Sequence, residues 1–185
     1  MSDETIDLYL IQDPDVVFPD NDNTRGFNRE LLRYYNNSIR IKNIWEFIFR
    51  LNVEVTVRRK LIKKLIIGSH GSGIPSGYGT FHIGSTLLNH EDDDINLLKR
   101  VAHLFVKEAD VYIMACRTGY DQALLRKVSN ALGGVRVHGY TDYITTTNYG
   151  LFVTLDDGTD DEGSEIVCLP GSCRVVRKPI SVKLM

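Results

Sequence analysis

Apolar and polar residues alternate near the start of the chain, with the period that a half-buried β-strand requires. Residues 5–11 (TIDLYLI) follow this pattern, and the Pro- and Asp-rich stretch after them cannot continue a strand. Over residues 28–51 the apolar spacing changes to three and four, which predicts a helix in two pieces. The valines in 53–57 alternate again, so we expect a short strand there.

Two short uninterrupted apolar runs follow, of the kind found in strands buried on both faces of a parallel sheet. The first, 65–67, runs into a glycine-rich segment at His70, and the second, 111–115, ends at Cys116. The other predicted elements are a hairpin strand over 80–83, a helix from Asn89 with acidic residues 91–94 in its first turn, a helix over 121–132 stopped by two glycines, a strand over 135–138, a hairpin of strands 151–155 and 165–169, and an edge segment over 174–184.

Strands that alternate with helices indicate an α/β fold with a mostly parallel sheet and helices on both faces. We expect residues 1–185 to form a single domain, because no Pro- or Ser-rich linker divides them. In such sheets, reactive groups gather where strands end at the carboxyl edge. His70 and Cys116 are both predicted to lie at that edge.

Composition is that of a globular protein and narrows the choice of partners. The chain has 43% hydrophobic and 25% charged residues and a formal charge of -2, so neither nucleic acid nor a membrane is an expected partner. The acidic N-terminus lacks a signal-peptide pattern and no window has the length of a membrane span, which predicts a cytoplasmic location. Three cysteines, an odd number, argue against a disulfide framework and for a reducing compartment.

Cys116 and His70 together suggest acyl-transfer chemistry. A thiolate can attack a carbonyl carbon if a base handles the protons and amide donors hold the oxyanion. Cys116 leaves a buried strand where the chain turns toward a helix, and His70 ends the preceding strand, 46 residues earlier (116 minus 70). Neighbouring strand ends would bring the two side chains within reach. The amides of Gly71 and Cys116 could then form an oxyanion hole.

The stretches LIIGSHG (65–71) and IMACRTG (113–119) resemble the paired His-Gly and Ala-Cys motifs of caspase-like cysteine peptidases, the clan that also contains gingipains, separases and CHAT domains. Met114 replaces the Gln of the caspase signature, and Thr118 is an added residue before the glycine. GTFHIGSTLL (79–88) and VRVHG (135–139) loosely resemble bacterial CHAT-like domains, which follow their His with a Gly-rich hairpin. The resemblance covers about residues 61–144.

The resemblance implies a caspase-like three-layer sandwich with a C-terminal β-hairpin, and a cysteine endopeptidase that cleaves a protein, or itself, through a thioester acyl-enzyme. Cys116 would be the nucleophile and His70 the acid and base, with the Gly71 and Cys116 amides as oxyanion donors. It implies no cofactor, and a regulatory protein partner is compatible with it. An inactive binding module on the same fold and an enzyme acting on a non-peptide acyl group are the alternatives.

Other residues carry weaker signals. Asp142 lies where related peptidases build a specificity pocket and would favour a basic P1 residue, although a turn is the simpler interpretation, and Arg117 is a second candidate substrate contact. His138 is the reserve base. The glycine-rich loop lacks the Lys of a phosphate-binding loop, the acidic residues 92–94 are a solvated helix start, and the basic run over 58–64 only weakly suggests polyphosphate binding. Cysteines 168 and 173 are interpreted as hairpin residues rather than as a metal site. We expect His82 in a turn, His90 at a helix start and His103 on a helix face.

Overall fold

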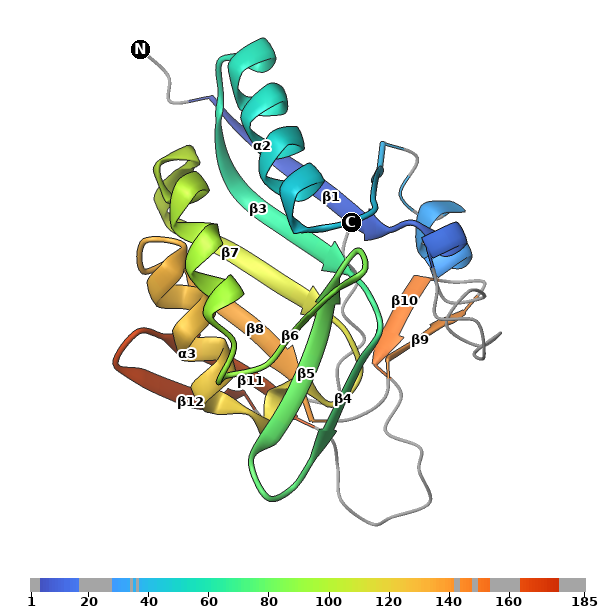
Figure 1. Ribbon diagram of the computed structural model, residues 1–185, viewed down its shortest axis with the longest axis vertical. Helices are drawn as coiled ribbons and strands as arrows, with labels where there is room; N and C mark the ends of the chain where they lie inside the picture. The colour runs from blue at the N-terminus through green and yellow to red at the C-terminus, as the bar shows by residue number, and fades with distance from the viewer. Residues whose placement is uncertain are drawn as a thin grey trace.

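A seven-stranded mixed sheet forms the centre of the computed structural model, which describes residues 4–16, 28–33, 35, 37–141, 144–147, 150–153 and 164–176 (Figure 1). Five adjacent strands are mutually parallel, whereas β11 (Glu165–Leu169) is antiparallel to both of its neighbours. In sheet order the strands are β12 (Ser172–Val176), β11 (Glu165–Leu169), β8 (Arg136–Tyr140), β7 (Phe105–Met114), β3 (Leu61–Gly68), β1 (Thr5–Gln12) and β2 (Ile39–Ile41). The predicted α/β class with a mostly parallel sheet is confirmed.

Two smaller antiparallel sheets accompany the large one. One follows β3 directly and contains β4 (Gly71–Ile74), β5 (Tyr78–Ile83) and β6 (Thr86–Leu88), with β5 in the middle. The other pairs β9 (Ile144–Thr147) with β10 (Gly150–Val153). The hairpin strand predicted over 80–83 is therefore confirmed as part of β5.

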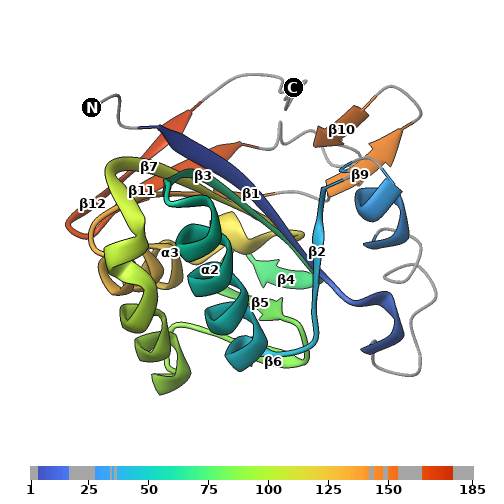
Figure 2. The ribbon, with the colours of Figure 1, turned by 90° about the horizontal axis from the view of Figure 1, so that it is seen from above.

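Helices cover one face of the large sheet, as Figure 2 shows for α2 (Ile44–Arg58), α3 (Gln122–Ala131) and the 3-10 helix η2 (Asp93–Leu104). Alternate residues of the central strands, such as Leu8, Leu10, Leu65, Ile67, Val111 and Ile113, join one buried apolar cluster with these helices. On the opposite face, Leu31 from the helical residues 28–33 packs with Ile11 and Ile66 in a second cluster. The arrangement is compatible with a three-layer sandwich. Two further 3-10 turns are η1 (Pro14–Val16) and η3 (Thr118–Tyr120).

The strand predicted over residues 53–57 is wrong, because these valines belong to α2. Asn43 is the N-cap of this helix, and its side chain accepts a hydrogen bond from the Glu46 N–H. Burial at helical spacing of Ile44, Phe47, Ile48 and Leu51 then fixes the segment as helix. The preference of β-branched residues for strands is weaker than this packing. The helix predicted in two pieces over 28–51 does occur as two pieces, residues 28–33 and α2, with strand β2 between them.

The acidic helix begins later than predicted. Asn89 does not start it but forms a turn, in which its Oδ1 accepts from the Glu91 and Asp92 N–H groups. Asp92 is the N-cap of η2, and Asp93 and Asp94 fill the first turn, as the helix dipole favours. Its hydrogen bonds have the tighter 3-10 pattern over 12 residues.

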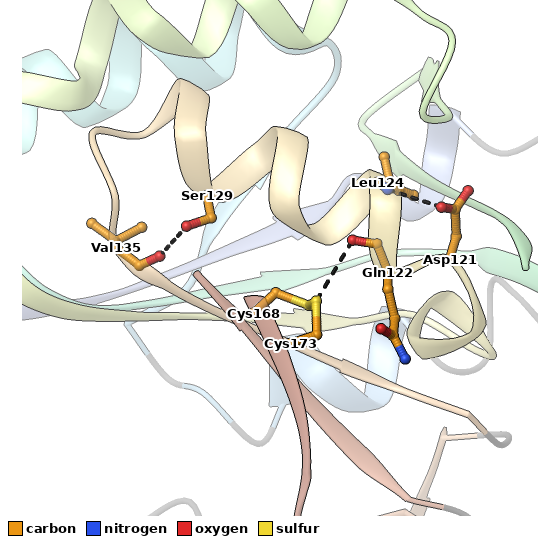
Figure 3. Close-up of a disulfide and its surroundings, with 7 residues drawn as sticks. All are labelled: Asp121, Gln122, Leu124, Ser129, Val135, Cys168 and Cys173. Carbon is orange, nitrogen blue, oxygen red and sulfur yellow. Dashed lines mark hydrogen bonds between the residues drawn. A yellow bond between two sulfur atoms is a disulfide. The ribbon is translucent and has the colours of Figure 1, made fainter. Parts of the chain in front are cut away.

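The C-terminal strands pair differently from the prediction. The strand over 151–155 was expected to pair with 165–169, but β10 pairs with β9, and β11 pairs with β8 and β12. In the β11–β12 register Cys168 lies opposite Cys173, and the two form a disulfide beside α3 (Figure 3). The sequence argued against a disulfide framework, whereas the structure contains this one disulfide within the described residues.

Several predictions fall on residues outside the described part of the chain. These are Asp142, residues 154–155 of a predicted hairpin strand and residues 177–184 of the predicted edge segment. The described start of that segment, β12, does form one edge of the large sheet. Within the described residues, no helix combines the length and apolar character that crossing a membrane requires.

Candidate functional site

His70 and Cys116 follow neighbouring parallel strands. In the register of β3 with β7, Gly68 lies opposite Met114. Just past the strand ends, the Ser69 N–H donates to the Met114 carbonyl oxygen at 3.1 Å. The prediction that the two strands are adjacent and end at the same edge is confirmed. The catalytic roles of the two residues remain predictions.

Glycines after His70 let the Cys116 turn pack against the hairpin backbone. A Cβ added at Gly71 would lie 2.7 Å from the Ala115 Cβ and 3.0 Å from the Cys116 carbonyl oxygen. A Cβ added at Gly73 would lie 2.1 Å from the Arg117 carbonyl oxygen. The 2.7 and 2.1 Å separations are shorter than real Cβ contacts allow, so close packing against the Cys116 turn explains the two glycines. The segment forms strands β4 and β5, and no phosphate-binding role is needed to account for it.

The Gly71 N–H points away from the hairpin ladder. Gly71 lies opposite Phe81, and the flanking hydrogen bond runs from the His82 N–H to the His70 carbonyl oxygen at 3.1 Å. This pattern makes Gly71 and Phe81 a non-hydrogen-bonded pair, whose amides point outward from both strands. Because β4 is an edge strand of its sheet, the Gly71 N–H is directed to that edge. A donor for an oxyanion needs this arrangement.

Cys116 sits half-buried on a tight turn. Arg117, which follows it, has a left-handed backbone with φ of 57°, and the chain then enters η3. The Thr118 hydroxyl donates to the Ala115 carbonyl oxygen at 3.1 Å and closes the turn. From β9, the Ile144 N–H donates to the Cys116 Sγ at 3.5 Å. A backbone donor at this position interacts more strongly with a thiolate than with a thiol.

Backbone hydrogen bonds hold His70 on both sides. Its N–H donates to the Gln12 Oε1 at 3.2 Å, and its carbonyl oxygen accepts from the His82 N–H and the Ser69 hydroxyl. The imidazole is half-buried. Burial lowers the pKa of His70 below its ordinary value of 6.5. The ring is therefore mainly neutral at pH 7 and able to accept a proton.

His82 lies beside His70 and is more deeply buried. It belongs to strand β5 rather than to the predicted turn, is 6% exposed, and its ring centroid is 6.0 Å from that of His70. Burial, and to a smaller extent the charge of His70, lower the pKa of His82 to about 4. His82 is thus a neutral neighbour of His70 across the physiological range.

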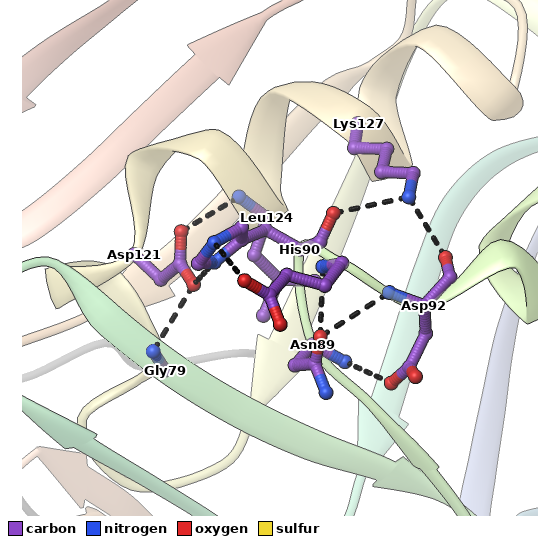
Figure 4. Close-up of polar contacts among 8 residues, drawn as sticks. Gly79, Asn89, His90, Asp92, Asp121, Leu124 and Lys127 are labelled. Carbon is purple, nitrogen blue, oxygen red and sulfur yellow. Dashed lines mark hydrogen bonds and ion pairs between the residues drawn. The ribbon is translucent and has the colours of Figure 1, made fainter.

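Asp121 connects the hairpin to the helix that follows Cys116 (Figure 4). Its fully buried carboxylate accepts from the Gly79 N–H at 3.1 Å, from the Leu124 N–H at 2.9 Å as the N-cap of α3, and pairs with the His90 Nδ1 at 2.6 Å. Lys127, which belongs to α3, donates to the His90 carbonyl oxygen. His90 therefore contributes to this network, and the helix start predicted for it is wrong.

The reserve base, His138, has a plain structural role. Its Nδ1 is 2.5 Å from the Glu165 Oε1 and its Nε2 is 3.0 Å from the Asp110 Oδ1, so both ring nitrogens are occupied. The ring stacks on Tyr112 with centroids 4.1 Å apart. Burial raises the pKa of Asp110, but hydrogen bonds from Arg136 and His138 outweigh it and leave that pKa lowered. These contacts tie β7, β8 and β11 together.

The other predicted candidates contribute less. Arg117 is half-buried next to Cys116, whereas Asp142 lies outside the described residues. His103 is exposed on η2. The described residues contain no group of three or more His, Cys, Asp or Glu side chains that could hold a metal ion. The cysteine pair 168–173 forms the disulfide described above.

Three contacts of this site were missed from sequence: Gln12 on the His70 amide, Asp121 on the hairpin, and the Ile144 amide on the sulfur. Gln12 follows the predicted strand 5–11 and belongs to no motif, and a backbone amide leaves no sequence signal. Comparisons with family models, curated proteins and solved structures found no match to this chain.

Proposed function

We propose that the protein is a caspase-like cysteine endopeptidase in which Cys116 is the nucleophile and His70 the acid and base. One observation carries the proposal. The glycine hairpin that follows His70 packs directly on the turn that carries Cys116, at the carboxyl ends of two adjacent parallel strands. The caspase-like motifs around both residues support it, and so does the β4–β6 hairpin after His70, which that resemblance implies. The finer fold assignment, a caspase-like sandwich, belongs to the same proposal.

The first half of the reaction forms a thioester. The neutral His70 imidazole takes the Cys116 thiol proton as Sγ attacks the scissile carbonyl carbon. The carbonyl electrons move onto oxygen, and the N–H groups of Gly71 and Cys116 stabilise that charge. When the intermediate collapses, the C–N bond breaks and His70 delivers its proton to the departing amine. The Ile144 N–H, which donates to Sγ, stabilises negative charge on the attacking sulfur.

The second half hydrolyses the thioester. His70, neutral again, takes a proton from water as the water oxygen attacks the thioester carbon, and the C–S bond breaks. His70 then returns the proton to the sulfur. The substrate is a protein or the chain itself, and Asp142 and Arg117 are proposed to contact it. This scheme needs no cofactor.

A peptide-library cleavage assay with mass-spectrometric readout tests the proposal. The wild-type protein is expected to cleave a defined subset of peptides, and Cys116→Ala and His70→Ala to lose cleavage by at least about a hundredfold. His103→Ala is the matched control, because it removes an exposed histidine elsewhere and should keep full activity. Cleavage that survives in Cys116→Ala would contradict the assignment. Acylation of Cys116 by non-peptide esters without any peptide cleavage would point to the acyl-transfer alternative.

A further inference from the structure

We infer that Gln12 is a positioning residue of the candidate site, and that it sets the place of His70 relative to Cys116. This inference rests on the function proposed above and assigns a role to a residue outside both motifs. Gln12 ends strand β1, whose neighbour in the sheet is β3, the strand that leads to His70. Its side chain is 2% exposed and crosses from one strand end to the next.

The Gln12 amide makes three hydrogen bonds, two of them buried and the one to His70 partly buried. Nε2 donates to the Gly84 carbonyl oxygen at 2.9 Å, and Oε1 accepts from the His70 N–H and from the Asn28 Nδ2, each at 3.2 Å. A carbonyl oxygen can only accept, so the contact with Gly84 fixes which end of the amide is the NH₂ group. The oxygen must then face His70. Gln12 therefore has one orientation in this site.

The Gly84 end of this link is rigid. Gly84 has φ of 61°, and a Cβ added there would lie 2.1 Å from the Lys42 carbonyl carbon, so its backbone is packed against the chain before α2. The Ser85 N–H also donates to the Lys42 carbonyl oxygen at 2.7 Å. Gln12 thus links the His70 N–H to two rigid parts of the fold, strand β1 and the turn between β5 and β6.

The hydrogen bond from the His70 N–H to Gln12 matters because the hairpin holds the His70 carbonyl group and not its N–H. The His70 carbonyl oxygen is held by the His82 N–H, within the hairpin, but its N–H is directed to Gln12. The preceding residue, Ser69, is tied to β7 through the Met114 carbonyl oxygen. Without Gln12, the partly buried His70 N–H loses this partner, and the chain between Ser69 and Gly71 can rotate to satisfy it. Such a rotation moves the imidazole.

The test is the pH dependence of Cys116 alkylation by iodoacetamide, measured from pH 5 to 9 alongside thermal unfolding. His70→Ala gives the rate without the base. Gln12→Met keeps the side-chain volume and removes all three bonds, and we expect its rate at pH 7 to fall about fivefold, toward that of His70→Ala. Ser129→Ala is the control for stability, because its buried hydroxyl donates to the Val135 carbonyl oxygen at 2.6 Å. Val135 lies just before the amino end of β8, whereas His70 and Cys116 follow the carboxyl ends of their strands.

The outcomes separate the two claims. A Gln12→Met profile that coincides with wild type, while His70→Ala differs, would overturn the positioning role alone. Identical profiles for wild type and His70→Ala would overturn the proposed function and this inference with it. A shifted Gln12→Met profile beside an unshifted Ser129→Ala profile of similar melting temperature supports the role. If Gln12→Met does not fold, Gln12→Asn repeats the test, because its amide is one methylene too short to reach the same partners.

Discussion

Replacing Gly73 by alanine tests the contact between the glycine hairpin and the Cys116 turn. Gly73 has an ordinary backbone conformation, so the effect of the added methyl group is steric. Its Cβ would lie 2.1 Å from the Arg117 carbonyl oxygen, whereas ordinary contact begins at 3.4 Å, so the two must separate by 1.3 Å (3.4 minus 2.1). The neighbour is backbone and cannot rotate away as a side chain would.

This separation affects both stability and chemistry. Overpacking of a well-packed site costs about 1–3 kcal/mol, and we expect the upper part of that range because backbone must move. The moving segment carries Cys116, and a displacement of about 1 Å between reacting groups costs roughly a hundredfold in rate. The expected result is a lower melting temperature together with a large loss of kcat/KM for peptide cleavage.

The control is Gly171→Ala in the turn between β11 and β12. A Cβ at Gly171 meets nothing within 4 Å, so this variant should match wild type in both assays. Differential scanning calorimetry and the kcat/KM for the best library peptide give the two readouts. A Gly73→Ala protein with wild-type melting temperature and wild-type kcat/KM would refute the close packing of the two segments.

Three further predictions concern stability and thiol chemistry. His82 has a folded-state pKa of about 4 against an ordinary 6.5, so as the pH falls the unfolded state binds the proton first. Between pH 6.5 and 4 the free energy of unfolding should therefore fall by about 3 kcal/mol. Urea titrations should find this loss in the wild type and not in His82→Gln. Asp121→Ala leaves buried N–H groups without an acceptor and removes a helix cap, so chemical denaturation should show a loss of about 3 kcal/mol, and a change below about 1 kcal/mol would contradict the network. Under denaturing, non-reducing conditions iodoacetamide should label Cys116 alone, and labelling of Cys168 and Cys173 before reduction would contradict their disulfide.

Local pattern was sufficient for the elements that lie in the middle of the sheet. The apolar runs at 65–67 and 111–115 predicted β3 and β7, because strands buried on both faces need continuous apolar sequence. The valines of α2 led to a wrong prediction, because three alternating β-branched residues fit a strand locally. The Asn43 cap and the buried face at helical spacing make the segment a helix. The C-terminal pairing was also wrong, because strand partners are chosen by long-range contacts that local sequence does not encode.

The candidate site divides in the same way. His70 and Cys116 could be placed together from sequence, because the carboxyl ends of adjacent parallel strands meet at one edge. The residues that hold His70 and Cys116 in place could not be predicted from sequence. Gln12 and Asp121 act through distant backbone groups, and the Ile144 contribution is a backbone N–H that any residue supplies.

Covalent labelling with peptidyl acyloxymethyl ketones tests the central claim most directly, because these electrophiles react with activated cysteine nucleophiles. Intact-mass measurement after incubation with a panel of differing P1 residues is expected to show a single adduct, mapped to Cys116. The adduct should form at least about a hundredfold more slowly in His70→Ala and at an unchanged rate in His103→Ala. A folded wild-type protein that acquires no adduct at Cys116 with any member of the panel would contradict the assignment of Cys116 and His70 as a catalytic pair.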